Sequence, residues 1–243
     1  MNERELTVRV ADITFGIRCR YDVLPLICED YIVEDGTPDF WLSATDEEIA
    51  VEQEKADEPI GEGLAESSAI HRKLGEKLLA YDAFLFHAAV IEYEGVGYAF
   101  SAQSGVGKTT HIRLWREHFG DGVRIINGDK PIVRFVDGKV YAYGTPWCGK
   151  ERYNINDKCE LRNVCFIERD AENSLATLQN KDALLRLFPQ VMLHRSGKDN
   201  LTVLALLDRF FERESFYLLR CNPTRQAAEV AYYGMNVERK AKV

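Results

Sequence analysis

Hydrophobic and polar residues alternate along the first part of the chain in the manner of β-strands. Apolar side chains recur at every second position in residues 6–10 and again in residues 13–17, and turn-forming residues interrupt the pattern further on. We therefore expect a small β-rich N-terminal region over residues 1–60. A polar stretch with one proline and two glycines, residues 54–63, is the predicted linker to the rest of the chain.

From residue 64 onward, helical and strand-like patterns alternate to the end of the chain, which is typical of an α/β domain. The elements predicted after a first helix over residues 64–81 are a strand pair at 87–93 and 96–101, a helix at 109–119, a strand at 123–126, a strand pair at 133–136 and 139–143, a strand at 164–168, helices at 181–193 and 200–214, a strand at 216–219 and a last helix ending near 233.

The first strand pair turns at Glu94-Gly95. If the turn has two residues, paired positions sum to 189 and His87 falls opposite Ala102, whereas a longer turn would slip this register by a residue or two. Asp137-Gly138 is a second strong hairpin signal. A histidine at the start of a strand is often only a packed side chain, but here its ring is expected near the segment that begins at Ala102.

That segment, Ala102-Gln103-Ser104-Gly105-Val106-Gly107-Lys108-Thr109-Thr110, has nearly every part of a phosphate-binding loop. Its glycines let backbone N–H groups face phosphate oxygens, the lysine reaches the β- and γ-phosphates, and the first threonine offers a hydroxyl to Mg²⁺. The strict pattern has glycine where Ala102 stands, and alanine fits unless the site needs a positive φ. A glycine-rich turn without a ligand is the alternative. The residues assigned to nucleotide binding are Ser104, Gly105, Val106, Gly107, Lys108, Thr109 and Thr110.

Asp129 directly follows the short apolar strand at 123–126 and the turn Asn127-Gly128. An acid at a strand end beside a phosphate loop can organise Mg²⁺, although turns also favour such acids. The loop at 144–152 contains charged residues beyond what a connection requires. Lys150 or Arg152 could offset charge on a transferring phosphoryl group and Glu151 could bind the metal, or the loop is simply solvated.

Composition narrows the class of protein. The chain has 243 residues, 46% hydrophobic and 29% charged, which is typical of a soluble globular protein. Its net charge of −8 without a basic block argues against nucleic-acid binding, and it has no membrane-length apolar stretch and no signal-like start, so we expect a cytoplasmic protein. The six cysteines have no metal or redox spacing and are expected to be reduced. His71, His111, His118 and His194 are expected to be packing or surface residues.

The segment from His87 to Thr109 resembles, without a gap, the catalytic core of HPr kinase/phosphorylase. Relatives of that family include the ATP-dependent phosphoenolpyruvate carboxykinases, and the group has a strand hairpin immediately before its P-loop. Residues 104–115, 127–131 and 144–150 are most similar to a bacterial branch of HPr-kinase-like proteins. Some members of that branch occur near peptide-modification genes, and some phosphorylate a serine of a precursor peptide.

The resemblance implies roles for individual residues. Lys108 would bind the β- and γ-phosphates, Thr109 the metal, and His87 would assist at the reacting centre. True HPr kinase has two adjacent aspartates after its second core strand, one implicated as base and one in metal binding, whereas only Asp129 stands here. The HPr-binding signature is not recognisable and the N-terminal part is shorter than the HPr kinase regulatory domain, so HPr is not the expected substrate.

We therefore predict an α/β fold with an HPr kinase/PEP carboxykinase-like P-loop domain over residues 64–243. The predicted function is transfer of the γ-phosphoryl group of ATP, or of GTP, with Mg²⁺, to a hydroxyl of a peptide, a protein serine or a small molecule. The alternative is a nucleotide-binding module without phosphotransfer, acting as an ATP-gated partner in a peptide-processing assembly; carboxykinase chemistry is a third option. Homo-oligomerisation is left open. The predicted catalytic residues are His87, Lys108, Asp129, Lys150 and Arg152, and the predicted metal ligands are Thr109, Asp129 and Glu151.

Overall fold

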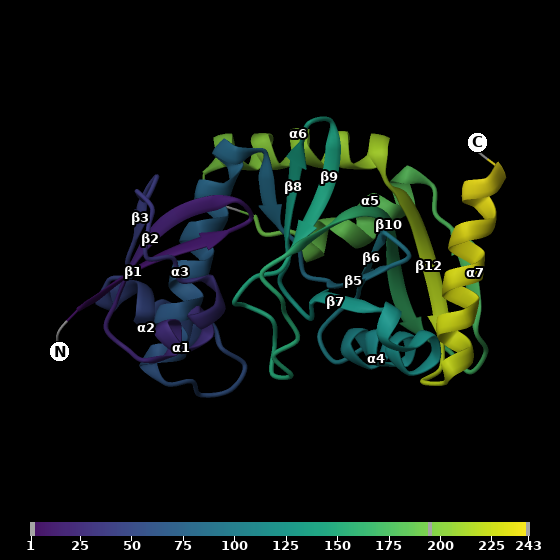
Figure 1. The fold of residues 1–243 in the computed structure, drawn as a ribbon, viewed down its shortest axis with the longest axis horizontal. Helices are drawn as coiled ribbons and strands as arrows, with labels where there is room; N and C mark the ends of the chain where they lie inside the picture. Colours follow the sequence, from purple (N-terminus) through teal and green to yellow (C-terminus); the bar gives the residue numbers. More distant parts are fainter. Residues whose placement is uncertain (1–2, 194–195, 242–243) are drawn as a thin grey trace. The chain divides into compact units, whose positions relative to one another are not determined.

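The computed structural model describes residues 3–193 and 196–241 and divides the chain into two compact units, Met1–Tyr81 and Asp82–Val243 (Figure 1). The stretch 54–63, predicted to link two domains, lies inside the first unit, where it joins two helices. The division comes after Tyr81, so the helix predicted at 64–81 is part of the first unit and not of the second, where the predicted P-loop domain was expected to include it.

The first unit combines a small sheet with helices. β1 (Arg4–Val10) and β2 (Ile13–Cys19) pair antiparallel, and the short β3 (Trp41–Leu42) pairs parallel with β2. The helical elements are α1 (Val23–Ile27), η1 (Glu29–Tyr31), α2 (Asp46–Lys55), α3 (Glu62–Leu78) and η2 (Leu79–Tyr81).

Two features of this unit correct the prediction of a β-rich region ending at residue 60. α2 is a helix because the side chain of Thr45 accepts the backbone N–H of Glu48 while Glu48 accepts the N–H of Thr45, a capping box that satisfies two donors at the helix start. α3 belongs here because its buried Glu66 accepts the backbone N–H groups of Arg20 at 2.9 Å and Tyr21 at 3.2 Å, just after β2.

The second unit is a mixed α/β structure whose sheet curls around one long strand, β10 (Lys158–Arg169). The first residues of β10 pair antiparallel with β9 (Lys139–Tyr143), which continues to β8 (Ile132–Val136) and β4 (Ala83–Leu85). The rest of β10 lies between two parallel neighbours. The strands on that side are β6 (Val96–Ser101), β5 (Ala89–Tyr93), β7 (Arg124–Asn127), β12 (Ser215–Cys221) and β11 (Ser174–Thr177).

Helices cover both faces of this sheet. α4 (Lys108–Phe119) and α7 (Arg225–Ala241) lie against each other (Figure 1). Between these helices and the sheet lies an apolar cluster that includes the fully buried Trp115. α6 (Gly197–Arg213) covers the opposite face, where Phe210 packs edge-on against Phe84 and Phe216. The remaining helical segments are η3 (Gly120–Gly122), α5 (Asn180–Leu187) and η4 (Phe188–Gln190).

Two expectations about composition can be compared with the structure. All six cysteines are buried as free thiols, in agreement with their expected reduced state. In the part of the chain that the structure describes, no helix combines the length and apolar character needed to cross a membrane.

Candidate functional site

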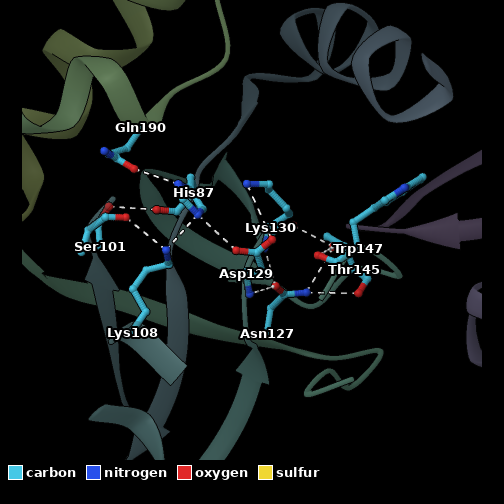
Figure 2. Close-up of polar contacts among 10 residues, drawn as sticks. His87, Ser101, Lys108, Asn127, Asp129, Lys130, Thr145, Trp147 and Gln190 are labelled. Carbon is cyan, nitrogen blue, oxygen red and sulfur yellow. Dashed lines mark hydrogen bonds and ion pairs between the residues drawn. The ribbon is translucent and has the colours of Figure 1, made fainter. Parts of the chain in front are cut away.

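The topology of the second unit brings the candidate residues to one edge of the sheet. β6 and β7 run in the same direction because each pairs antiparallel with β5, so their C-terminal ends lie beside the start of β5. The predicted phosphate loop follows β6, Asp129 follows β7 and His87 precedes β5. Residues from three separate parts of the sequence therefore meet at this edge, as Figure 2 shows.

The loop at 102–107 has the backbone conformation that its glycines allow. Gly105 has a φ of 77° and Gly107 a φ of 130°, a region that side chains rarely adopt, while a Cβ at either position would meet nothing within 4 Å. Conformation rather than space therefore requires these glycines. Ala102 is not among the described non-glycine residues with positive φ, so alanine is compatible with this position.

The loop leads directly into α4, which begins at Lys108 and has no acidic residue in its first turn. Free N–H groups at a helix start attract anions. Arg169, at the end of β10, donates from Nε to the carbonyl of Val106 at 3.0 Å and from Nη2 to the carbonyl of Gly105. Arg169 thus engages two loop carbonyls, a role that we did not predict although it directly follows the strand predicted at 164–168.

Lys108 is buried under the loop. Its Nζ donates to the carbonyl of Ala102 at 3.1 Å and lies 2.8 Å from Nε2 of His87. Burial lowers the pKa of Lys108, the nearby carboxylate of Asp129 opposes that shift, and the positive charge of Lys130 adds to it. The structure therefore holds this ammonium between the loop and the start of β5.

His87 is fixed through both backbone and side chain. Its carbonyl accepts the hydroxyl of Ser101 at 2.8 Å, which fits the predicted hairpin register. Its Nε2 lies 3.2 Å from Oδ1 of Asp129, and its Nδ1 lies 2.8 Å from Oε1 of Gln190. His87 thus contacts both Lys108 and Asp129, and Gln190, at the end of η4, is a contact that sequence reasoning missed.

The position of Asp129 depends on the fully buried Asn127. Oδ1 of Asn127 accepts the backbone N–H groups of Asp129 at 2.9 Å and Lys130 at 2.7 Å, and its Nδ2 donates to the carbonyl and hydroxyl oxygens of Thr145, each at 3.1 Å. An asparagine that closes a turn in this way fixes the backbone that follows it. The turn closed by Asn127 therefore fixes the backbone of Asp129, whose carboxylate lies beside His87.

Asp129 is surrounded by positive or protonatable groups. Burial would raise the pKa of Asp129, but the neighbouring ring of His87 and the charges of Lys130 and Lys108 outweigh burial and lower the pKa from its ordinary value. Nζ of Lys130 is 3.6 Å from Oδ2 of Asp129, and burial lowers the pKa of Lys130 against the opposing effect of Asp129. Lys130 is a second residue at this edge that we did not predict as part of the site.

The loop at 144–152 passes close to Asp129, but its charged side chains do not join the group in Figure 2. A Cβ at Gly149 would lie 3.3 Å from Cβ of Asp129, so the backbone makes a close approach there. Lys150, Glu151 and Arg152 are exposed, and none of the contacts found among the described residues joins them to the His87–Asp129 pair. Their predicted catalytic and metal roles stay predictions.

Of the other histidines, His111 lies closest in sequence to the loop. It is buried in α4, where its Nε2 accepts the indole N–H of Trp115 at 3.0 Å and its ring packs on Phe100 at 4.5 Å. Burial lowers the pKa of His111 to about 3, so it is a neutral packing residue, as predicted. His194 lies outside the described residues.

Among known proteins, a likeness is found in the fold and not in the sequence. No family model matches the sequence, and no curated protein matches it. The fold has a coarse likeness to the HPr(Ser) kinase/phosphatase from Coxiella burnetii, with 9% sequence identity, a TM-score of 0.39, and coverage of 65% of this chain and 99% of that chain. A likeness at this level does not establish a shared function, which has to be argued from the site itself.

Proposed function

We propose that this protein transfers the γ-phosphoryl group of a nucleoside triphosphate to a hydroxyl group. The proposal rests on one observation above all: a buried lysine at the start of α4 and a carboxylate both contact one imidazole, beside the loop predicted to bind phosphate. A site for phosphoryl transfer needs a cation at the phosphates and a group that accepts the proton of the attacking hydroxyl.

The roles follow from position. The loop N–H groups and Lys108 hold the β- and γ-phosphates, and Asp129 or His87 takes the proton of the acceptor hydroxyl as its oxygen bonds to phosphorus. The bond from phosphorus to the β,γ-bridging oxygen breaks, and the nucleoside diphosphate leaves. Asp129 is ionised at neutral pH because its pKa is low, so it is ready to accept a hydrogen bond from the hydroxyl.

Mg²⁺ fits this arrangement as an ion carried by the nucleotide. No group of three or more histidine, cysteine, aspartate or glutamate side chains suited to a metal ion occurs within the described residues. Protein sites for Mg²⁺ often supply only one or two ligands and leave the rest to phosphates and water. The hydroxyl of Thr109 and the carboxylate of Asp129 are the ligands proposed here, and the bound ion would supply charge neutralisation at the β- and γ-phosphates.

A second candidate is a nucleotide-binding module without phosphotransfer, an ATP-gated partner in a peptide-processing assembly. Its support is that Asp129 already contacts an imidazole and a lysine, while no second carboxylate adjoins it in sequence. In the leading proposal the acceptor is a peptide, a protein serine or a small molecule, and the nucleotide is ATP or GTP.

The experiment that separates the two candidates is incubation of the purified protein with γ-labelled ATP, Mg²⁺ and a cell lysate. We expect label on an acceptor with the wild type and none with Lys108→Ala, because no other ammonium among the described residues lies under the loop to neutralise the β- and γ-phosphates. Circular dichroism would check that the variant is folded. Nucleotide binding without any labelled acceptor would support the binding module, and turnover by Lys108→Ala at the wild-type rate would contradict the phosphate-loop assignment.

A further inference from the structure

The imidazole of His87 is held from the side opposite the phosphate loop by η4. The backbone N–H of His87 donates to the carbonyl of Gln190 at 2.8 Å, and Phe86 forms an isolated β-bridge with Val191. The side chain of Gln190 then places Oε1 2.8 Å from Nδ1 of His87 (Figure 2). Three contacts from one short segment thus fix both the backbone and the ring of this histidine.

The partners of the ring determine which nitrogen carries the proton. Nε2 lies 2.8 Å from Nζ of Lys108, and a lysine ammonium can only donate hydrogen bonds. A neutral imidazole that accepts at Nε2 must carry its proton on Nδ1, and that proton needs an acceptor. Oε1 of Gln190 is in place as this acceptor. Oδ1 of Asp129 also lies near Nε2, but at 3.2 Å it is farther from that nitrogen than Nζ of Lys108 at 2.8 Å, so the shortest contacts on the two sides of the ring agree with a proton on Nδ1.

We infer that Gln190 is a positioning residue that holds His87 in the Nδ1–H tautomer. The lone pair of Nε2 then accepts from Lys108, beside the carboxylate of Asp129, at the place where the proposed reaction releases a proton. This inference rests on the proposed function for its chemical meaning, but the tautomer itself does not depend on it. The side chain of Gln190 acts on the site through His87, so its effect on the reaction passes through that ring.

The contact between Lys108 and His87 also has a consequence for the state with a bound nucleotide. Without a nucleotide its ammonium occupies the Nε2 lone pair of His87 and the carbonyl of Ala102. A triphosphate on the loop offers Lys108 stronger, charge-assisted partners. Nε2 is then released to accept a hydrogen bond from the incoming hydroxyl, and the bond from Gln190 keeps the ring from turning away.

The test compares Gln190→Leu, which removes the acceptor, with Gln190→Glu, which keeps one. Gln179→Leu is the matched control, because Gln179 stands at the start of α5 and its side chain caps nothing there. Nitrogen NMR of protein labelled in its histidine rings reports which nitrogen is protonated, and the signal of His87 is identified by its loss in His87→Gln. Label transfer and nucleotide affinity are measured on the same samples.

We expect the Nδ1–H tautomer in the wild type, in Gln190→Glu and in Gln179→Leu, and loss of that single tautomer in Gln190→Leu. Transfer by Gln190→Leu should fall about 10- to 100-fold, with a smaller loss in Gln190→Glu and unchanged nucleotide affinity. An Nε2–H tautomer in the wild type, or a Gln190→Leu protein that matches Gln179→Leu in both readouts, would overturn the inference. If the tautomer is as expected but no acceptor is ever labelled, the positioning role stands and the proposed kinase activity fails.

Discussion

Lys108 contacts the imidazole of His87 and Asp129 lies 3.6 Å from Lys130, so each charged group at the loop already has a partner before any ligand arrives. A buried ammonium or carboxylate without a partner would be costly. The imidazole of His87 contacts both Lys108 and Asp129, and the turn closed by Asn127 fixes the backbone of Asp129. No direct ion pair between Lys108 and Asp129 is found among the described residues. A nucleotide phosphate can therefore replace an existing partner of Lys108 instead of finding an uncompensated charge.

The first prediction at this scale concerns Asp129. Asp129→Asn keeps the shape of the side chain and the backbone turn set by Asn127 but removes the charge, so transfer should fall by about 10²- to 10⁴-fold while some nucleotide binding remains. Single-turnover transfer and nucleotide titration measure the two effects separately. A variant that transfers at a rate within about threefold of the wild type would make Asp129 only a turn residue.

The second prediction concerns His87. His87→Ala should lower turnover by about 10²- to 10⁴-fold with little change in nucleotide affinity, because the ring contacts the reacting edge and not the loop amides. His87→Gln should restore part of the rate if the ring only orients its neighbours, and almost none if it transfers a proton. The control is His118→Ala, since His118 lies at the other end of α4 and pairs with Glu229 at 3.4 Å. Equal rates in His87→Ala and His118→Ala would exclude a catalytic role.

At the scale of elements, short-range patterns predicted the parts that form the site. The turn at Glu94-Gly95 has two residues, Tyr93 pairs with Val96 and Ala89 with Phe100, which confirms the register in which positions sum to 189. Val136 pairs with Lys139 across the second predicted turn. α4 ends at Phe119, and Gly120 follows with a φ of 72°, as the glycine signal indicated. Each of these features depends on neighbours within a few residues.

The features that were missed depend on distant contacts or on a cap. Gln190 meets His87 across 103 positions of sequence and Arg169 meets Val106 across 63, and neither residue has a local pattern that marks its partner. The helix α2, in contrast, does have a local signal in the sequence, the capping box formed by Thr45 and Glu48. The strand-like alternation of neighbouring residues nevertheless led to the prediction of a β-rich region there. The boundary after Tyr81 depends on the burial of Glu66 against residues that precede it by more than forty positions.

At the scale of the whole molecule, stability should depend on a buried acid outside the site. Glu214 lies between α6 and β12 and is buried. Burial raises the pKa of its carboxyl group from 4.5 to about 8, although the charges of Arg162 and Arg213 oppose this shift. The folded protein therefore binds this proton more tightly than the unfolded chain does. This contribution to the free energy of unfolding is complete below pH 4.5 and is lost as the pH rises through about 8.

We expect Glu214→Gln to remove that dependence. The free energy of unfolding of the variant minus that of the wild type should be larger at pH 9 than at pH 5. The reason is that the amide stays neutral at pH 9, where the carboxyl group must ionise. Urea unfolding at the two pH values measures the difference, with Glu212→Gln at an exposed position of α6 as the control. Parallel pH curves for the wild type and Glu214→Gln would show that Glu214 is already ionised in the folded protein.

The strand β10 also has a consequence for how the second unit folds. The hairpins β5–β6 and β8–β9 close short loops and can form from neighbouring sequence, which costs little chain entropy. β10 must then pair with β9 through its first residues and with β6 and β12 through the rest, and β12 is distant from β10 in sequence. Contacts between such distant segments are slow to form. Pairing along β10 is therefore expected to follow the two hairpins, and it joins the β5–β6–β7 edge, which carries the loop, the histidine and the carboxylate, to the rest of the sheet.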